Sequence, residues 1–306
     1  MDRRDFLKAT SLVAALTAGK LTGIFGRETF AAESAPAPDD ANKVVAVRGN
    51  DPAAMFRQGI AALGGIAAFV KPRQKVIVKP NIGWDKTPEL AANTNPNLIG
   101  EIVRQALAAG ASEVGVLDHT CDHWQGCYKN SGIAQAVEAA GGKMLLAHEE
   151  SAYVERQCAS AKILKSAKIH RAVLDCDVLI NAPVLKNHGG AKMTGALKNY
   201  MGVIWDRGFM HSHNLHQTIA DLPFYRPADL TVVDAYRVVT SRGPKGGSAN
   251  DVKLLGYQLL SRDMVAADAL AVKLIGYRLA DVPHIEIASS MGLGSIANAE
   301  NITRIG

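Results

Sequence analysis

The stretch DVLINAPVLKNHGGAKMTGALKN, residues Asp177–Asn199, decides the fold. It begins with an apolar run typical of a buried strand, which we expect to stop at Pro183 and to release a loop rich in lysine, histidine and glycine. Thr194 is expected to cap a helix that begins at Gly195, whose free N–H groups favour an anion. We therefore interpret the segment as a binding site at the end of a strand. The alternative is a solvated basic loop that leads into an amphipathic helix.

Strand-like runs alternate with helix-like segments along the rest of the chain, a pattern typical of a parallel sheet covered by helices. We predict an α/β fold with a mostly parallel, doubly wound sheet and helices on both faces. The expected strands are Val44–Arg48, Lys75–Val78, Glu113–Leu117, Lys143–Ala147, Lys162–Leu164, Val178–Asn181 and Leu230–Val233. The expected helices are Asp51–Val70, Pro96–Ala109, Ser131–Ala140, His170–Cys176, Gly195–Gly202, Leu215–Asp221 and Arg262–Ile275. Ser241–Asn250 is expected to be a long loop, either a lid over a site or an exposed connection.

The first residues resemble a twin-arginine export signal. The core RRDFLK occupies residues 3–8, with Asp2 where the motif prefers Ser or Thr, and a modestly apolar run follows. The alternative, a transmembrane anchor, fits poorly because the run is short, rich in Ala, Thr and Gly, and contains Lys20. We predict a signal peptide over residues 1–31, a flexible segment over 32–43 and one α/β domain over 44–306. The resemblance implies the twin-arginine translocase as a partner, a periplasmic or extracytoplasmic location, and no stable membrane span after cleavage.

Composition, net charge and cysteine spacing limit which classes of protein this chain can belong to. The chain is 48% hydrophobic, enough for a substantial core. Removal of residues 1–31, which hold five Lys or Arg and three Asp or Glu, lowers the formal net charge from +5 to about +3. Such a mild charge argues against nucleic acid as a partner. Four cysteines are present without a Cys-x-x-Cys pair, so the chain has no iron–sulfur cluster motif.

Polar side chains follow several of the expected strands, at the point where each strand ends. In open α/β sheets ligands bind beyond the carboxyl ends of the strands, so we expect these side chains to share one rim. The residues are Lys79, Asn81, Asp118, His119 and Asp234, and the lysine-rich loop follows the strand that ends at Asn181. Single instances also arise from ordinary turns. For Thr94 and Asn95, ahead of Pro96, capping of the next helix and ligand contact both remain open.

Two segments of the sequence contain clusters of residue types that commonly act as metal ligands. His119, Cys121, His123 and Cys127 lie within nine residues, which suits zinc, copper or iron. A Cys121–Cys127 disulfide and two unlinked thiols are the alternatives. In the second cluster, His211-x-His213-x-x-His216, His213 and His216 would share a helix face and either bind a metal or act as acid and base. Unpartnered surface histidines are the alternative there. The cofactor stays open, with a metal ion as one candidate.

Several motifs together resemble a bacterial and archaeal family named domain of unknown function 362 (DUF362). The motifs are Lys79-Pro80-Asn81, the run from Asp177 through Asn181, Pro183 and Lys186 to His188, Thr194-Gly-Ala-Leu-Lys198-Asn199, and Asp234. The resemblance extends from about Val44 to the C-terminus. Many relatives carry ferredoxin-like cluster segments, which this chain lacks, and the family implies no particular activity.

A fainter resemblance concerns the nickel-pincer lactate racemases. His188, Gly189-Gly190 and Lys198 look like a loosened version of their site loop. That resemblance implies a lysine that holds the cofactor, at Lys198, and a metal ligand or base at His188. The spacing and order of the residues differ from the racemase pattern.

Two functional hypotheses follow. In the first, an exported α/β protein binds a small anionic ligand or cofactor, with or without a metal, and performs redox or proton-transfer chemistry if it is an enzyme. The expected ligand-binding residues are Lys79, Asn81, Asn181, Lys186, Thr194, Lys198, Asn199 and Asp234. Asp118, His119 and His188 are the candidates for proton transfer or metal ligation. In the second, a non-catalytic periplasmic protein delivers a metal or serves a redox partner protein.

Overall fold

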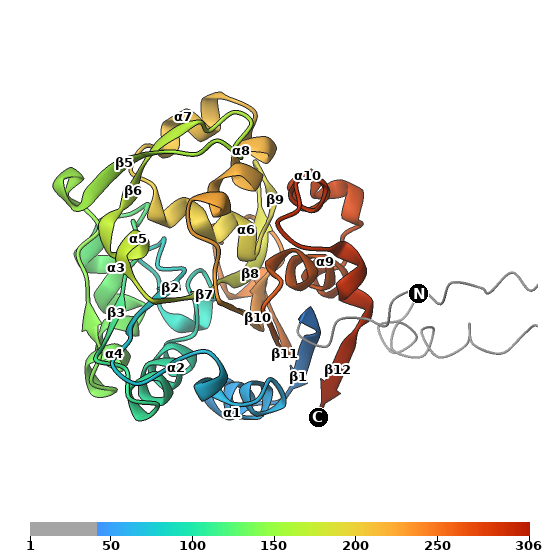
Figure 1. Ribbon diagram of the computed structural model, residues 1–306. Coiled ribbons are helices and arrows are strands. Elements are labelled where there is room, and N and C mark those ends of the chain that lie inside the picture. Colours follow the sequence, from blue (N-terminus) through green and yellow to red (C-terminus); the bar gives the residue numbers. More distant parts are fainter. Residues whose placement is uncertain (1–41) are drawn as a thin grey trace, which may run out of the picture. The chain divides into compact units, whose positions relative to one another are not determined.

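One mixed, mostly parallel sheet organises residues 42–306, the part of the chain that the computed structural model describes (Figure 1). Its strands lie in the order β12-β1-β11-β10-β7-β2-β3-β4, with β8 paired to β10 and β9 paired to β8, and β5 and β6 form a separate two-stranded sheet. The bounds are β1 Val44–Arg48, β2 Lys75–Pro80, β3 Glu113–Val116, β4 Lys143–Met144, β5 Tyr153–Gln157, β6 Ser166–His170, β7 Val178–Ala182, β8 Val184–His188, β9 Lys192–Thr194, β10 Leu230–Val239, β11 Val252–Ser261 and β12 Ile302–Ile305. The predicted signal peptide, residues 1–31, and residues 32–41 lie outside the described part.

Helices cover both faces of this sheet, as the alternation of buried residues along its strands requires. Val76 and Val78 pack into a core with α1, α2 and α4, whereas Ile77 between them packs into a second core with α6, α8, α9 and α10. The bounds are α1 Pro52–Ala62, α2 Pro96–Ala108, α3 Trp124–Asn130, α4 Ile133–Ala139, α5 Arg171–Asp175, α6 Ala196–Asn199, α7 Arg207–Ser212, α8 Leu215–Asp221, α9 Met264–Ile275 and α10 Pro283–Ser290. The predicted α/β class with a mostly parallel sheet is therefore confirmed. Across residues 42–306, every helix is too short or too polar to cross a bilayer.

The prediction of a strand at Lys162–Leu164 is wrong. The backbone N–H groups of this segment donate instead to the carboxylate of Asp221, at 2.7–2.9 Å, so they cannot take part in a sheet ladder. The strands on either side, β5 and β6, pair with each other. The sequence pattern also did not reveal β12, the edge strand that pairs with β1, or β11, which lies between β1 and β10.

The lysine-rich segment after Pro183 is a β-hairpin and not the loop that we expected. Strand β10 continues to Val239, well past the predicted end at Val233, and its second half pairs with β8. The backbone N–H of Asp234 donates to the Pro183 carbonyl at 2.8 Å, which joins β8 to β10 directly after β7 ends. Because β10 offers this extra edge, the chain after Pro183 remains extended and places Lys186 inside the fold.

The predicted cap of the next helix is also wrong. Gly195 is the N-cap residue of α6, and Thr194 is the last residue of β9. The free N–H groups of Ala196 and Leu197 donate to the buried carboxylate of Asp268, at 2.6 and 3.0 Å. The group that accepts from this helix terminus is therefore the Asp268 side chain of α9, and burial raises the pKa of that carboxyl to about 7. A Cβ on Gly195 would lie 2.2 Å from the Asp268 carboxylate, so this glycine is required by the close approach.

Candidate functional site

A cavity of about 380 Å³ opens at the carboxyl ends of β2 and β3, beside the β8–β9 hairpin and α6. Most of the predicted site residues line it together. They are Lys79, Asn81, Asp118, His119, Lys186, His188, Thr194, Lys198 and Asn199. The three lysines that lie far apart in the sequence are thus brought to one cavity, which is the arrangement that the anion hypothesis needs.

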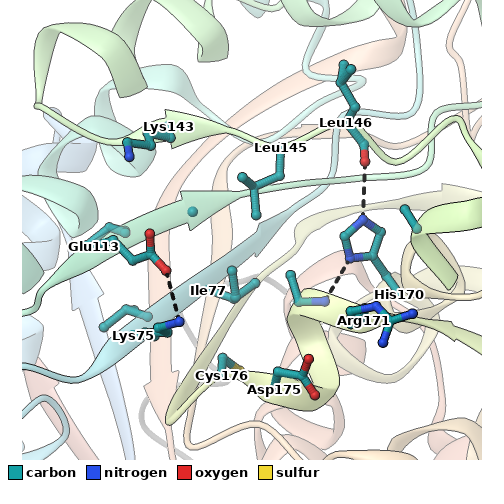
Figure 2. Close-up of a pocket in the computed structure, with 15 residues that line it drawn as sticks. Lys75, Ile77, Glu113, Lys143, Leu145, Leu146, His170, Arg171, Asp175 and Cys176 are labelled. Atoms are coloured by element: carbon teal, nitrogen blue, oxygen red, sulfur yellow. Dashed lines mark hydrogen bonds and ion pairs between the residues drawn. The ribbon is translucent and has the colours of Figure 1, made fainter. Parts of the chain in front are cut away.

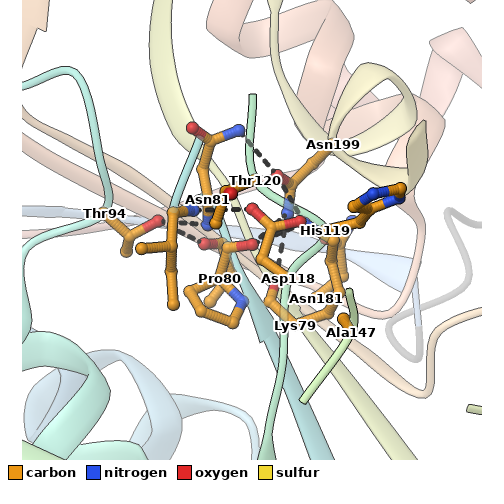
Figure 3. A network of polar contacts seen from close by, with 12 residues as sticks. Lys79, Pro80, Asn81, Thr94, Asp118, His119, Thr120, Ala147, Asn181 and Asn199 are labelled. Carbon is orange, nitrogen blue, oxygen red and sulfur yellow. Dashed lines mark hydrogen bonds and ion pairs between the residues drawn. The ribbon is translucent and has the colours of Figure 1, made fainter. Parts of the chain in front are cut away.

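The floor of the cavity is a closed polar network (Figure 3). The buried ammonium of Lys79 lies 2.8 Å from an Asp118 carboxylate oxygen and also donates to the Pro80 carbonyl and to Asn199. The other Asp118 oxygen accepts the backbone N–H of Ile82 at 2.6 Å. Since its charge is compensated within the chain, Lys79 holds β2 and β3 together and has little capacity left for a ligand.

Asn199 joins the strands of this floor. Its amide nitrogen donates to Asn181 at 2.8 Å and to the Lys79 carbonyl at 3.1 Å, while its oxygen accepts from Asn81 at 3.0 Å. Asn181, fully buried below the cavity, donates onward to the Ala196 carbonyl. Both asparagines therefore position the cavity wall, and the role in orienting a ligand that we predicted for them is not supported by these contacts.

Gly202 makes the floor possible. It follows α6 and lies so near the Lys79–Asp118 pair that an added Cβ would meet the Asp118 carboxylate at 1.7 Å and the Lys79 ammonium at 2.7 Å. Its carbonyl accepts the backbone N–H of His119 at 3.0 Å. Any side chain here would separate the buried ion pair.

Lys186 and Lys198 differ from Lys79 because neither has a carboxylate partner within residues 42–306. Lys186 donates only to neutral oxygens, those of Asn81 at 2.9 Å and the Ala92 carbonyl at 2.5 Å, and burial lowers its pKa to about 7. Lys198 is 9% exposed, and in the described chain its amino group has no hydrogen-bond or ion-pair partner. Burial lowers the pKa of Lys198 to about 8. The cavity thus contains excess positive charge near neutral pH.

The two histidines in the wall have different hydrogen-bonding roles. His119 bonds through Nδ1 to the Ile204 carbonyl, which can only accept, so Nδ1 is the protonated nitrogen and Nε2 is the acceptor. His188 accepts the Ala191 N–H through Nδ1, so its Nε2 is the donor, and burial lowers its pKa to about 3. Of these two rings, His119 is the one whose Nε2 is left unprotonated and without a partner among residues 42–306, so the predicted proton-transfer role fits His119 better than His188.

Several wall residues were missed or misassigned from the sequence. Arg207 lines the cavity and donates to the carbonyls of His119 and Thr120, at 2.9 and 2.7 Å. Pro244 from the 241–250 loop is part of the wall, and the adjacent Lys245 forms an ion pair with Asp122 at 2.8 Å. Arg207 follows no motif or strand end, so its place could be found only from the tertiary structure.

Asp234, which we predicted to bind the ligand, does not line the cavity. Its contacts give it a positioning role instead. It lies within β10, and its buried carboxylate accepts the backbone N–H groups of Asn95 and Tyr236 at 2.8 and 3.1 Å. Asn95 in turn caps α2, whereas Thr94 accepts the Asn81 N–H at 2.8 Å. Of the two roles left open for Asn95, the structure shows capping.

The predicted metal ligands are not brought together. Within residues 42–306, no group of three or more His, Cys, Asp or Glu side chains is arranged to hold a metal ion. Cys121 is exposed and Cys127 is buried, and both are unlinked thiols, so the disulfide alternative is wrong. His119 stacks on Trp205, and His123 directly precedes α3.

The second histidine cluster also separates. His213 follows the end of α7 and stacks on Phe209, with ring centroids 3.9 Å apart. His216 lies on α8, where its Nδ1 is 3.1 Å from Nδ1 of the buried His284. Because α7 ends before His213, the two residues do not share the helix face on which the prediction depended. His211 is the member of the cluster that lines the cavity.

A second cavity, of about 430 Å³, lies along the first residues of β2 and β3 (Figure 2). Its wall includes Ile77, Leu145 and Leu146. At its edge, Lys75 and Glu113 form an ion pair with 3.7 Å between Nζ and Oε1. His170 in this wall is held by hydrogen bonds to backbone atoms of Leu146 and Ala172. None of the predicted site residues lines this cavity, so the cationic cavity is the better candidate site.

Fold and site define an α/β protein with a lysine-lined cavity at the carboxyl edge of its sheet. The family model described as domain of unknown function (DUF362) matches residues 76–273, and the chain belongs to that family. It is 24% identical over 260 residues to a thylakoid-associated protein of Synechocystis sp., a match that covers 80% of this chain and 76% of the relative.

Two solved structures are also similar to this chain. One is the lactate racemase apoprotein of Thermoanaerobacterium thermosaccharolyticum, with a TM-score of 0.49, 11% identity and coverage of 78% of this chain and 58% of the racemase. The other is a protein of Thermotoga maritima, with a TM-score of 0.43, 12% identity and coverage of 79% and 60%. The chain thus spans less than two thirds of either neighbour, and a similarity at this level carries no statement about activity.

Proposed function

We propose that the cationic cavity binds a small organic anion, a carboxylate or phosphate, through Lys198 and Lys186. The observation that carries this proposal is Lys198, a residue nine-tenths buried that lines the cavity and whose amino group has no partner among the described residues. A buried charge is costly unless an opposite charge compensates it. A bound anion supplies that compensation, and the ammonium groups supply charge-assisted hydrogen bonds.

The residues around the lysines support a further proposal, a class of reaction for the bound anion. His119 offers a basic ring nitrogen, and burial lowers its pKa below the ordinary range, which keeps the ring neutral at physiological pH. Proton transfer next to the carboxylate of the ligand is therefore the reaction class that this wall supports best. The alternative of a metal-delivery protein gains no support, because the candidate ligands are dispersed within residues 42–306.

The proposal is tested by anion-dependent stabilisation. Thermal unfolding is measured for the wild type and for Lys198→Met, each with acetate, succinate or inorganic phosphate at constant ionic strength. A ligand at a hundred times its Kd stabilises a protein by about 2.7 kcal/mol, so at least one anion should raise the wild-type Tm by several degrees. Lys198→Met should lose this shift.

Lys192→Met is the matched control, because Lys192 belongs to the same hairpin but is exposed and lies over the ring of Tyr277. It removes the same formal charge and should keep the anion-dependent shift. Equal shifts in all three proteins would place the anion elsewhere and contradict the proposal, as would the lack of a shift with every anion.

A further inference from the structure

One sulfur atom lies in the wall of the cationic cavity. Cys121 follows β3 and lines the cavity, while its backbone N–H donates to the Gly83 carbonyl at 2.8 Å. The side chain is exposed, so a ligand in the cavity can reach it. Cys127, six residues later, is fully buried, and burial raises the pKa of its thiol to about 11. Only the first of these two thiols is accessible from the cavity.

Positive groups on three separate elements border the cavity together with Cys121. The guanidinium of Arg207, at the start of α7, donates to the Cys121 sulfur at 3.3 Å. The same guanidinium is fixed by its bonds to the His119 and Thr120 carbonyls, so it holds this position without help from the sulfur. Lys186 on β8 and Lys198 on α6 line the same cavity. Positive charges in this arrangement attract anionic reagents towards the sulfur.

The second observation that points to a ligand is Lys198 itself. This residue, nine-tenths buried, lines the cavity that Cys121 also borders, and its amino group has no partner in the described chain, so an anion in the cavity could compensate its charge. A carboxylate held by the lysines would lie in the same 380 Å³ as the thiol. Binding at close range raises the effective concentration of an electrophile greatly.

We infer that Cys121 is a nucleophile that adds to an α,β-unsaturated carboxylate held by Lys186 and Lys198. In this step the Cys121 sulfur forms a bond to the β-carbon, and the π bond of the alkene breaks. The electron pair moves to the α-carbon, which takes a proton from water, while the thiol proton is released to water. The sum is one thiol plus one alkene giving one thioether, so no oxidant, reductant or metal is required. The inference rests on the proposed anion site and names the class of anion.

The first experiment measures reagent selectivity at each cysteine. The purified protein is labelled to low extent with iodoacetate, an anion, or with neutral iodoacetamide, and peptide mass spectrometry gives the rate at each thiol. The rate ratio of iodoacetate to iodoacetamide should be about tenfold higher at Cys121 than at the half-buried Cys158, which lies outside the cavity. High salt and Arg207→Gln should each lower the ratio at Cys121 towards that of Cys158.

The second experiment uses fumarate as the unsaturated carboxylate. A thioether adduct should form at Cys121 in the wild type and in Lys192→Met, and at least tenfold more slowly in Lys198→Met. Cys121→Ser should form no adduct at this position yet keep the anion-dependent rise in Tm, since the hydroxyl is close in size and the site is exposed. Loss of the adduct with an unchanged Tm shift in Cys121→Ser would separate the role of Cys121 as a nucleophile from anion binding by the lysines.

The outcomes are distinct. A normal anion-dependent Tm shift, with equal reagent ratios at Cys121 and Cys158 and no fumarate adduct, would overturn the inference and leave the anion site standing. The lack of any anion-dependent shift would overturn the proposed function first. A fumarate adduct that forms equally fast in Lys198→Met would show that the lysine does not hold the electrophile, and would also contradict the inference.

Discussion

The floor of the cavity and its open wall both contain buried lysines, yet they use them in opposite ways. On the floor, Lys79 is paired with Asp118 at 2.8 Å and enclosed by Asn199. In the wall, Lys198 is only 9% exposed but has no carboxylate partner in the described chain. The difference teaches that a buried charge compensated by the protein fixes the structure, whereas one left uncompensated is available to a ligand.

The largest expected effect comes from breaking the floor. Asp118→Ala leaves the Lys79 ammonium buried without its counter-charge, and such changes typically cost about 3–5 kcal/mol of unfolding free energy. Urea unfolding measures this. Glu113→Ala, which removes the exposed partner of Lys75, is the control and should cost less than about 1 kcal/mol. Similar losses in the two variants would mean that the floor pair has no special structural role.

The charge state of the wall should set how anion affinity depends on pH. Lys186 and Lys198 have pKa values lowered by burial to about 7 and about 8. Above these values the free protein loses the charge that attracts the ligand, so the association constant should fall by up to about tenfold per pH unit between pH 8 and 9. Isothermal titration with the best anion, at constant ionic strength, tests this. An association constant that is flat from pH 6 to 9 would contradict it.

The smallest expected effect concerns stability without ligand. Lys198→Met removes an uncompensated buried charge and keeps much of the volume, so it should raise the unfolding free energy of the ligand-free protein by about 1 kcal/mol near pH 7. Because the folded pKa of Lys198, about 8, lies below its ordinary 10.5, the cost is fully present below pH 8 and is relieved as pH rises towards 10.5. The advantage of the variant should therefore shrink over that interval.

Chemical unfolding at pH 7 and at pH 10, with Lys192→Met beside it, is the measurement. Lys192 is exposed, so its replacement should change the unfolding free energy little at either pH. A variant at position 198 that is less stable than the wild type at pH 7 would indicate that this lysine is compensated after all, like Lys79.

Some elements of the fold were predictable because the hydrophobic residues that identify them lie within one continuous segment of the chain. Val76, Ile77 and Val78 alternate between the two cores, and β1 and α8 begin and end where the sequence predicts. The hairpin β8–β9 was missed because its stability depends on the second half of β10, about fifty residues later. The cap of α6 was missed for the same reason, since Asp268 lies on α9.

The sequence by itself determined that strand ends bear Lys79, Asp118 and His119, and that a lysine-rich motif follows β7. It also determined which residue types were present for an anion site. Only the tertiary structure decided that Asp118 neutralises Lys79 and leaves Lys198 uncompensated, and that Arg207 and Cys121 meet at 3.3 Å. The physical reason is that pairing depends on distances of a few ångströms between segments separated by many residues, and a local sequence pattern contains no information on such distances.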